Sequence, residues 1–120
     1  MAPIFWIDKN KFSSDFIEKT FKKKNIPFYS LKEARNFAYL VDDLLPLAIV
    51  IDASTVQDTL AEFRSEFENS PRMQSTPFIF INEIPELDFV APLGVLRKPL
   101  DPFKVPDAVL SLINGKSSQQ

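Results

Sequence analysis

The fold of this chain is decided by residues 47–55, which read LAIVIDAST. Five apolar residues, three of them β-branched, end abruptly at Asp52. A strand that is apolar on both faces is typical of the middle of a parallel sheet, where both faces are covered. Ligands and chemistry gather at the carboxyl ends of the strands in such sheets. Asp52 therefore stands where a central strand would present a reactive group, although a carboxylate there could also only cap the next turn or form an internal ion pair.

The composition is that of one folded domain. The chain has 120 residues, of which 45% are hydrophobic and 25% charged, so it is long enough to bury a real core. Its net charge is −2, and its basic residues form no run beyond residues 22–24, which argues against nucleic acid as a partner. No apolar run approaches membrane-spanning length, and the N-terminus lacks a basic region followed by an apolar one. These features predict a cytoplasmic protein that binds neither nucleic acid nor membrane.

Several chemistries are excluded by the residues that the sequence lacks. It contains no cysteine and no histidine, which removes disulfides, thiol chemistry, the commonest zinc ligands and a histidine phosphoacceptor. It has only two glycines, Gly94 and Gly115, and so no glycine-rich phosphate loop. A serine nucleophile elbow and a histidine triad are also absent.

Strands alternate with helical patterns along the chain. Apolar residues recur at helical spacing over 12–21 and 56–67, and a capping box at 30–33 predicts a second helix over 34–41. Asp101-Pro102 should start a last helix, whose regular part should begin only at residue 105 or 106 because Pro106 would break a helix already running. Residues 69–76 should form a loop. The predicted strands are residues 4–7, 26–29, 47–52, 77–81 and 94–98. This alternation predicts a parallel α/β sheet with helices on both faces, formed by one domain over residues 1–115, with a disordered tail at 116–120.

Polar side chains follow four of these strands, at the point where each strand ends. They are Asp8, Asp52, Asn82 and Lys98. Because the carboxyl ends of parallel strands meet at one edge, we expect these side chains to surround one shallow depression. Two carboxylates so close repel unless a cation lies between them. That cation could be Mg²⁺, which prefers oxygen ligands, or the ammonium group of Lys9 or Lys98, and the spacing leaves both open.

With these residues in place, the chain resembles a response-regulator receiver domain of two-component signalling over almost its whole length. The resemblance rests on Ile7-Asp8, on residues 46–52, on Pro77 and on residues 94–102, which read GVLRKPLDP. The Lys-Pro pair in the last block is the most specific mark, and its peptide bond is typically cis in the family. The resemblance implies a flavodoxin-like, three-layer sandwich with strand order 2-1-3-4-5, and a signalling module that is not an enzyme.

The resemblance also implies roles for individual residues. Asp52 matches the phosphoacceptor, and Asp8 matches the first of two acidic residues that hold Mg²⁺. Ser54 matches the residue whose main-chain carbonyl completes that metal site, and Lys98 matches the lysine that contacts the acyl phosphate. Asn82 takes the place of the switch threonine or serine, and its amide can donate to a phosphoryl oxygen.

The chain departs from the family at several of these positions. The second acidic residue is Lys9, the small residue after the switch position is Glu83, and the aromatic switch residue is Val95. The stretch 82–98 is shorter than in the family, so the fourth helix should be short or missing. Within it we expect Phe89 to fold back onto the sheet, although this part could also be a partner surface.

These departures favour a degenerate receiver that acts as a regulatory protein-interaction module, with impaired Mg²⁺-dependent phosphorylation. Its partner would be a histidine kinase, a downstream effector or a second copy of the chain. The alternative is a functional receiver in which a histidine kinase or a small acyl phosphate loads Asp52, with Mg²⁺ bound between Asp52 and Asp8. A flavodoxin-like domain that binds a nucleotide or a flavin is the third hypothesis, and the scarcity of glycine argues against it.

Overall fold

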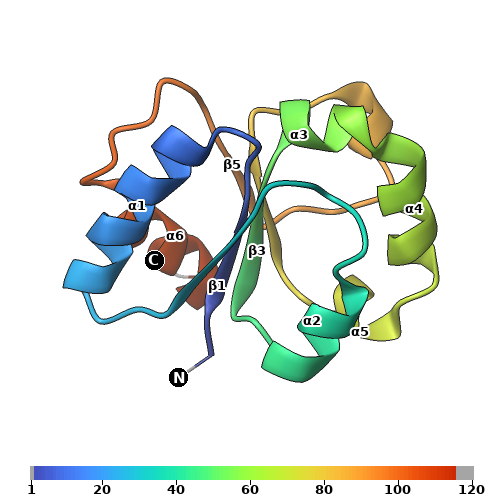
Figure 1. Cartoon of the computed structure of the whole chain (residues 1–120), viewed down its shortest axis with the longest axis horizontal. Helices are drawn as coiled ribbons and strands as arrows, with labels where there is room; N and C mark the ends of the chain where they lie inside the picture. Colours follow the sequence, from blue (N-terminus) through green and yellow to red (C-terminus); the bar gives the residue numbers. More distant parts are fainter. Residues whose placement is uncertain (1, 116–120) are drawn as a thin grey trace.

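A parallel sheet of five strands, in the order β2-β1-β3-β4-β5, forms the middle layer of the protein (Figure 1). The computed structural model describes residues 2–115, so the predicted tail at 116–120 lies outside the described residues. The strands are β1 (Ile4–Ile7), β2 (Phe28–Leu31), β3 (Ala48–Asp52), β4 (Phe78–Ile81) and β5 (Gly94–Leu96). The predicted parallel sheet and its strand order are confirmed.

Helices cover both faces of the sheet, which confirms the three-layer sandwich. Figure 1 shows α1 and α6 on one side of the sheet and α2 to α5 on the other. The first pair is α1 (Lys11–Lys23) and α6 (Val105–Asn114). The opposite layer contains α2 (Ala38–Leu44), α3 (Ala53–Asp58), α4 (Leu60–Glu68) and α5 (Pro71–Gln74). No helix within residues 2–115 is both long enough and apolar enough to cross a membrane.

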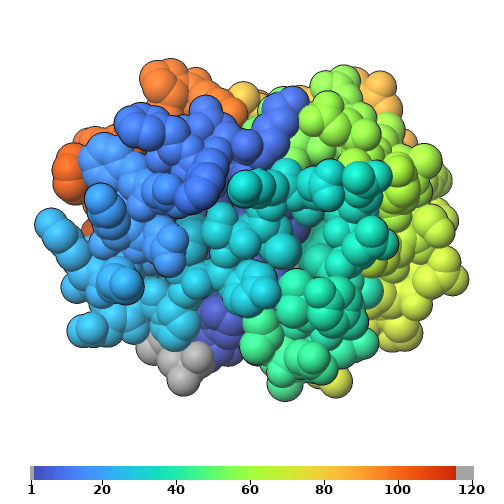
Figure 2. Space-filling view, in the orientation of Figure 1, coloured from blue at the N-terminus to red at the C-terminus, as the bar shows by residue number. Residues whose placement is uncertain are grey.

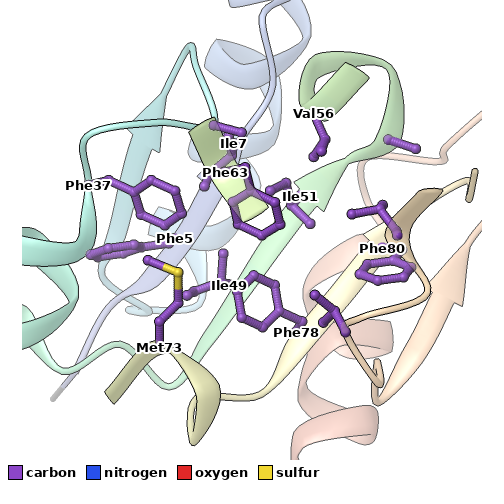
Figure 3. Packing of buried hydrophobic residues seen from close by; sticks show 14 of the residues in the cluster. Phe5, Ile7, Phe37, Ile49, Ile51, Val56, Phe63, Met73, Phe78 and Phe80 are labelled. Carbon is purple, nitrogen blue, oxygen red and sulfur yellow. The ribbon is translucent and has the colours of Figure 1, made fainter. Parts of the chain in front are cut away.

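The three central strands are buried along their whole length, as their apolar sequences predict. Successive side chains of a strand point to opposite faces, so the sheet contributes to two separate cores. Ile49 and Ile51 face α2 to α5 and pack in a cluster with Phe63 and Phe78 (Figure 3). Val50 belongs to the other cluster, which lies beneath α1 and α6. This burial fixes the strands in register and so fixes where their carboxyl ends lie.

The capping box predicted at residues 30–33 is wrong. Edge strand β2 runs through Ser30 to Leu31, and α2 begins only at Ala38. The α2 N-terminus is capped instead from α4, because one oxygen of Glu66 accepts from the N–H groups of Phe37 and Ala38 at 3.0 and 3.3 Å. A cap supplied from a distant residue leaves no local signal, which is why the sequence pattern misplaced this helix.

The apolar stripe over residues 56–67 is divided between two helices. The break lies at Thr59, whose buried hydroxyl donates to the carbonyl of Ala34 at 3.0 Å. A tertiary hydrogen bond thus interrupts a pattern that is continuous in sequence. The predicted loop at 69–76 contains α5, which begins after Ser70 because the hydroxyl of that residue accepts from the Met73 N–H at 3.1 Å.

The connection between β4 and β5 contains one turn of 3-10 helix, η1 (Pro85–Leu87), so the prediction of a short or missing fourth helix is confirmed. Leu87 and Val90 are buried, and Phe89 packs against Phe63 and Phe67. The segment therefore folds back onto the core, as expected. Strand β5 ends at Leu96, two residues earlier than predicted. Residues 102–104 form a turn rather than the start of the helix, and α6 begins at Val105, where its regular part was predicted to begin.

Candidate functional site

The candidate site lies where the carboxyl ends of β1, β3 and β5 meet. Asp8 follows β1, Asp52 is the last residue of β3, and Lys98 lies two residues after β5. The Lys98 ammonium lies 3.5 Å from Oδ2 of Asp52. The Asp52 charge also acts on Asp8, because it helps to raise the pKa of that carboxyl. The structure therefore brings these three predicted residues together.

Asp52 is almost completely buried, with 2% of its surface exposed, and its two oxygens differ in their surroundings. Oδ2 accepts from the Ser54 hydroxyl at 2.8 Å and from the Thr55 hydroxyl at 3.2 Å, in addition to its contact with Lys98. Oδ1 is buried and has no hydrogen-bond partner within the described residues. One side of this carboxylate is thus fully engaged, whereas the other is free to accept.

Asp8 is 4% exposed, and its carboxylate accepts one hydrogen bond from residues 2–115, from the Asn10 N–H to Oδ1 at 2.9 Å. Burial is the main reason that its pKa lies above the usual value, and repulsion from Asp52 raises the pKa further. The Asn10 N–H, the Lys98 charge and the Trp6 indole lower the pKa, but they do not cancel the effect of burial. The charged form of Asp8 is therefore poorly compensated by its surroundings.

Lys9 and Glu83, two of the departures from the receiver family, point away from the site. The Lys9 ammonium pairs with Asp58 on α3 at 3.1 Å, so Lys9 does not lie between the two carboxylates. Glu83 pairs with Arg97 at 2.7 Å on the exposed surface. Of the two lysines expected to neutralise Asp52, only Lys98 reaches it.

Asn82 lies at the edge of the site, with its backbone in the left-handed region at a φ of 58°. Its side-chain oxygen accepts from the backbone N–H of Lys98 at 3.2 Å. Asn82 thus links the end of β4 to the segment that carries Lys98. The Lys98-Pro99 peptide bond is cis, as predicted. The role of Asn82 toward a phosphoryl group stays a prediction.

Thr55 is a site residue that sequence reasoning did not identify. Its hydroxyl both donates to Asp52 and accepts from the backbone N–H of Lys9 at 2.9 Å. It therefore ties the loop after β1 to the carboxylate at the end of β3. A small hydroxyl residue three positions after a strand-end aspartate was the only available signal.

The residues present supply an incomplete set of Mg²⁺ ligands. Mg²⁺ needs near-octahedral oxygen coordination, and no group of three acidic, cysteine or histidine residues within 2–115 could hold a metal ion. Ser54 lies in the first turn of α3 and contacts Asp52 through its hydroxyl; the role of its main-chain carbonyl in a metal site stays a prediction. Asp52 Oδ1 and the second oxygen of Asp8 are the carboxylate oxygens left for a metal, and position 9 carries a lysine that pairs with Asp58.

Comparisons with known proteins identify the architecture. No family model matches the chain, and no curated protein sequence matches it. Solved structures that are similar include a response regulator from Desulfuromonas acetoxidans, with a TM-score of 0.77, 12% identity, and coverage of 95% of this chain and 98% of that chain. The chemotaxis response regulator CheY4 of Vibrio cholerae has a TM-score of 0.75 and 17% identity, with coverage of 93% and 98%.

A third similar structure is the receiver domain of the sensor histidine kinase PA1611 from Pseudomonas aeruginosa, which has a magnesium ion coordinated in its active site cleft. Its TM-score is 0.75 at 12% identity, and the match covers 95% of this chain and 98% of that one. At sequence identities this low, the structural similarity establishes a shared fold and nothing beyond it. This chain has the fold of the response-regulator receiver domains.

Proposed function

We propose that this chain is a receiver-like regulatory domain that acts by binding a protein partner, with Asp52 held by the protein's own donors rather than by a metal. The main support is the arrangement around Asp52 Oδ2, where two hydroxyl groups and the Lys98 ammonium converge. A buried carboxylate is stable only when it is paired and hydrogen-bonded. These donors stabilise Asp52 in its unmodified form, so the domain needs no phosphoryl group to hold one conformation.

The incomplete set of metal ligands supports the same proposal. A divalent cation would have to bind beside Lys98 with only Asp8 and one oxygen of Asp52 as carboxylate ligands. Lys9 is held on the protein surface by Asp58 and contributes no ligand. The partner would be a histidine kinase, a downstream effector or a second copy of the chain, and binding would not depend on the state of Asp52.

Phosphorylation of Asp52 is the second candidate function, and one observation favours it. Asp52 Oδ1 is buried without a hydrogen-bond partner among the described residues. Its lone pairs are free, so this oxygen could attack the phosphorus of a phosphoryl donor. The phosphoryl group would add about −1.5 to −2 charges beside Lys98. The two candidates therefore differ in whether this oxygen reacts.

The experiment that separates them is incubation of the purified chain with Mg²⁺ and beryllium fluoride, which mimics a phosphoryl group, while Trp6 fluorescence is recorded. Trp6 is the only tryptophan, is buried, and lies two residues before Asp8. We expect no saturable change, and no gain of a phosphoryl group by intact mass after incubation with acetyl phosphate and Mg²⁺. A saturable quench that is lost in Asp52→Asn would establish phosphorylation instead.

A further inference from the structure

A cavity of about 580 Å³ lies beside Asp8, between the N-terminal half of α1 and the segment that joins β5 to α6. Figure 2 shows the blue residues of α1 next to the orange residues of that segment. The residues that line the cavity include Phe12, Phe16, Leu100 and Pro102. A volume of this size, with mostly apolar walls and a few polar groups, is typical of small-molecule sites.

The inner end of the cavity carries an unpaired acid. Asp8 lines the cavity, is 4% exposed, and takes part in none of the ion pairs formed among residues 2–115. Its one backbone hydrogen bond within this part of the chain goes to Oδ1. The Trp6 indole and the Lys98 charge also favour its ionised form, but neither forms an ion pair with Asp8. A buried charge without a counter-ion is costly unless a partner supplies one.

The other charged groups nearby do not supply that partner. Lys98 also lines the cavity, but its ammonium is within ion-pair distance of Asp52. Lys9 pairs with Asp58. With Lys98 assigned to Asp52, the cavity keeps one net negative charge at Asp8, so it should select a cation.

Aromatic rings make up much of the remaining wall. Trp6 lines the cavity, and its buried indole lies close enough to Asp8 to lower the pKa of that carboxyl. Phe12 is 84% exposed and Phe16 is 41% exposed, although burying such rings would be favourable. Aromatic faces attract organic cations as well as apolar groups. The walls therefore suit a ligand in which a cation is attached to an apolar body.

We infer that this cavity is a binding site for a small organic ammonium compound, whose charged group pairs with Asp8 and whose apolar body packs against Phe12 and Phe16. The cavity was not expected from the sequence, and its function does not depend on phosphorylation of Asp52. Binding would place a cation next to the signalling carboxylates without a metal.

The test is titration of the purified chain with 2-phenylethylamine, which carries an ammonium group on an aromatic body, while Trp6 fluorescence is recorded. The neutral probe 2-phenylethanol has a similar shape without the charge. We expect a saturable change with the amine and binding at least about tenfold weaker with the alcohol, because a hydrogen bond to a charged group typically accounts for a factor of this size.

Three variants locate the site. Asp8→Asn should weaken amine binding at least about tenfold, for the same reason. Phe12→Ala removes an exposed ring and should weaken binding of both probes, whereas Asp15→Asn removes an exposed carboxylate outside the cavity and should change nothing. The inference is overturned if the amine gives no saturable change, if the alcohol binds as tightly, or if Asp8→Asn binds the amine normally. Chemical shift changes confined to residues 6–17 and 98–102 would locate the amine independently of fluorescence.

Discussion

Replacing Lys9 by aspartate tests why the site is a poor metal site. In the structure the Lys9 backbone N–H is tied to Thr55, so position 9 is held beside Asp52 while the side chain reaches outward to Asp58. An aspartate is too short to extend as far as a lysine. The change Lys9→Asp would place a third carboxylate near Asp8 and Asp52, and these are the oxygen ligands that Mg²⁺ prefers.

The expected magnitude follows from the contacts that are lost and gained. The Lys9–Asp58 pair is exposed on both sides, so its loss should cost less than about 1 kcal/mol of unfolding free energy. A site with a Kd of about 1 mM would gain about 1.4 kcal/mol at roughly 10 mM Mg²⁺. For a chain of this length that gain corresponds to a rise in Tm of about 5 °C.

The assay is thermal unfolding with and without about 10 mM MgCl₂, in which the original chain should shift by less than about 1 °C. Lys11→Asp is the matched control, because it makes the same charge change on an exposed α1 lysine that pairs with Asp15. The reasoning is refuted if Lys9→Asp gains no more stability from Mg²⁺ than Lys11→Asp does. It is also refuted if the original chain already shows the full shift.

Three further predictions concern stability. Phe63→Ala should lower the unfolding free energy in urea by about 3–5 kcal/mol, since this buried ring contacts four other phenylalanines; a loss below about 1 kcal/mol would contradict the packing. Glu66→Ala should cost about 1–2 kcal/mol, because two N–H groups at the start of α2 lose their acceptor; unchanged hydrogen exchange in α2 would contradict this. The pKa of Asp8 is higher in the folded state than its ordinary value of 3.8. Between these two values the folded state binds more protons than the unfolded state, so the unfolding free energy should fall as pH rises through this range. Asp8→Asn should remove that fall, and urea denaturation between about pH 4 and pH 7 would measure it.

The sheet could be predicted because its signals are local. Runs such as residues 47–51 are apolar on both faces, and each ends at a polar residue that marks the carboxyl end of the strand. The meeting of Asp8, Asp52 and Lys98 then follows from parallel pairing alone. The bounds of the helices on the α2 side were harder to predict, because they depend on contacts between residues far apart in sequence. Glu66 caps α2, and the break after α3 depends on the hydrogen bond between Thr59 and Ala34.

The direction of the long side chains at the site could not be predicted. Lys9 and Glu83 both lie just after strand ends, where a side chain can turn either into the site or toward the surface. Each finds an opposite charge on the surface, Asp58 and Arg97 respectively. An exposed ion pair keeps both groups hydrated, whereas entering the site would require their desolvation. The cavity beside α1 was also hidden, because it forms between segments about ninety residues apart in sequence.

The two buried carboxylates of the site differ in how far the surrounding protein compensates their charge. Asp8 and Asp52 are two buried carboxylates at one edge of the sheet, and the lysine at position 9 adds no third carboxylate to bind a metal between them. The structure compensates for one of them, because Ser54, Thr55 and Lys98 all contact Asp52 Oδ2. Asp8 receives no comparable set of donors within the described residues. A cationic ligand in the adjoining cavity would supply the opposite charge that Asp8 does not receive from an ion pair within the described residues.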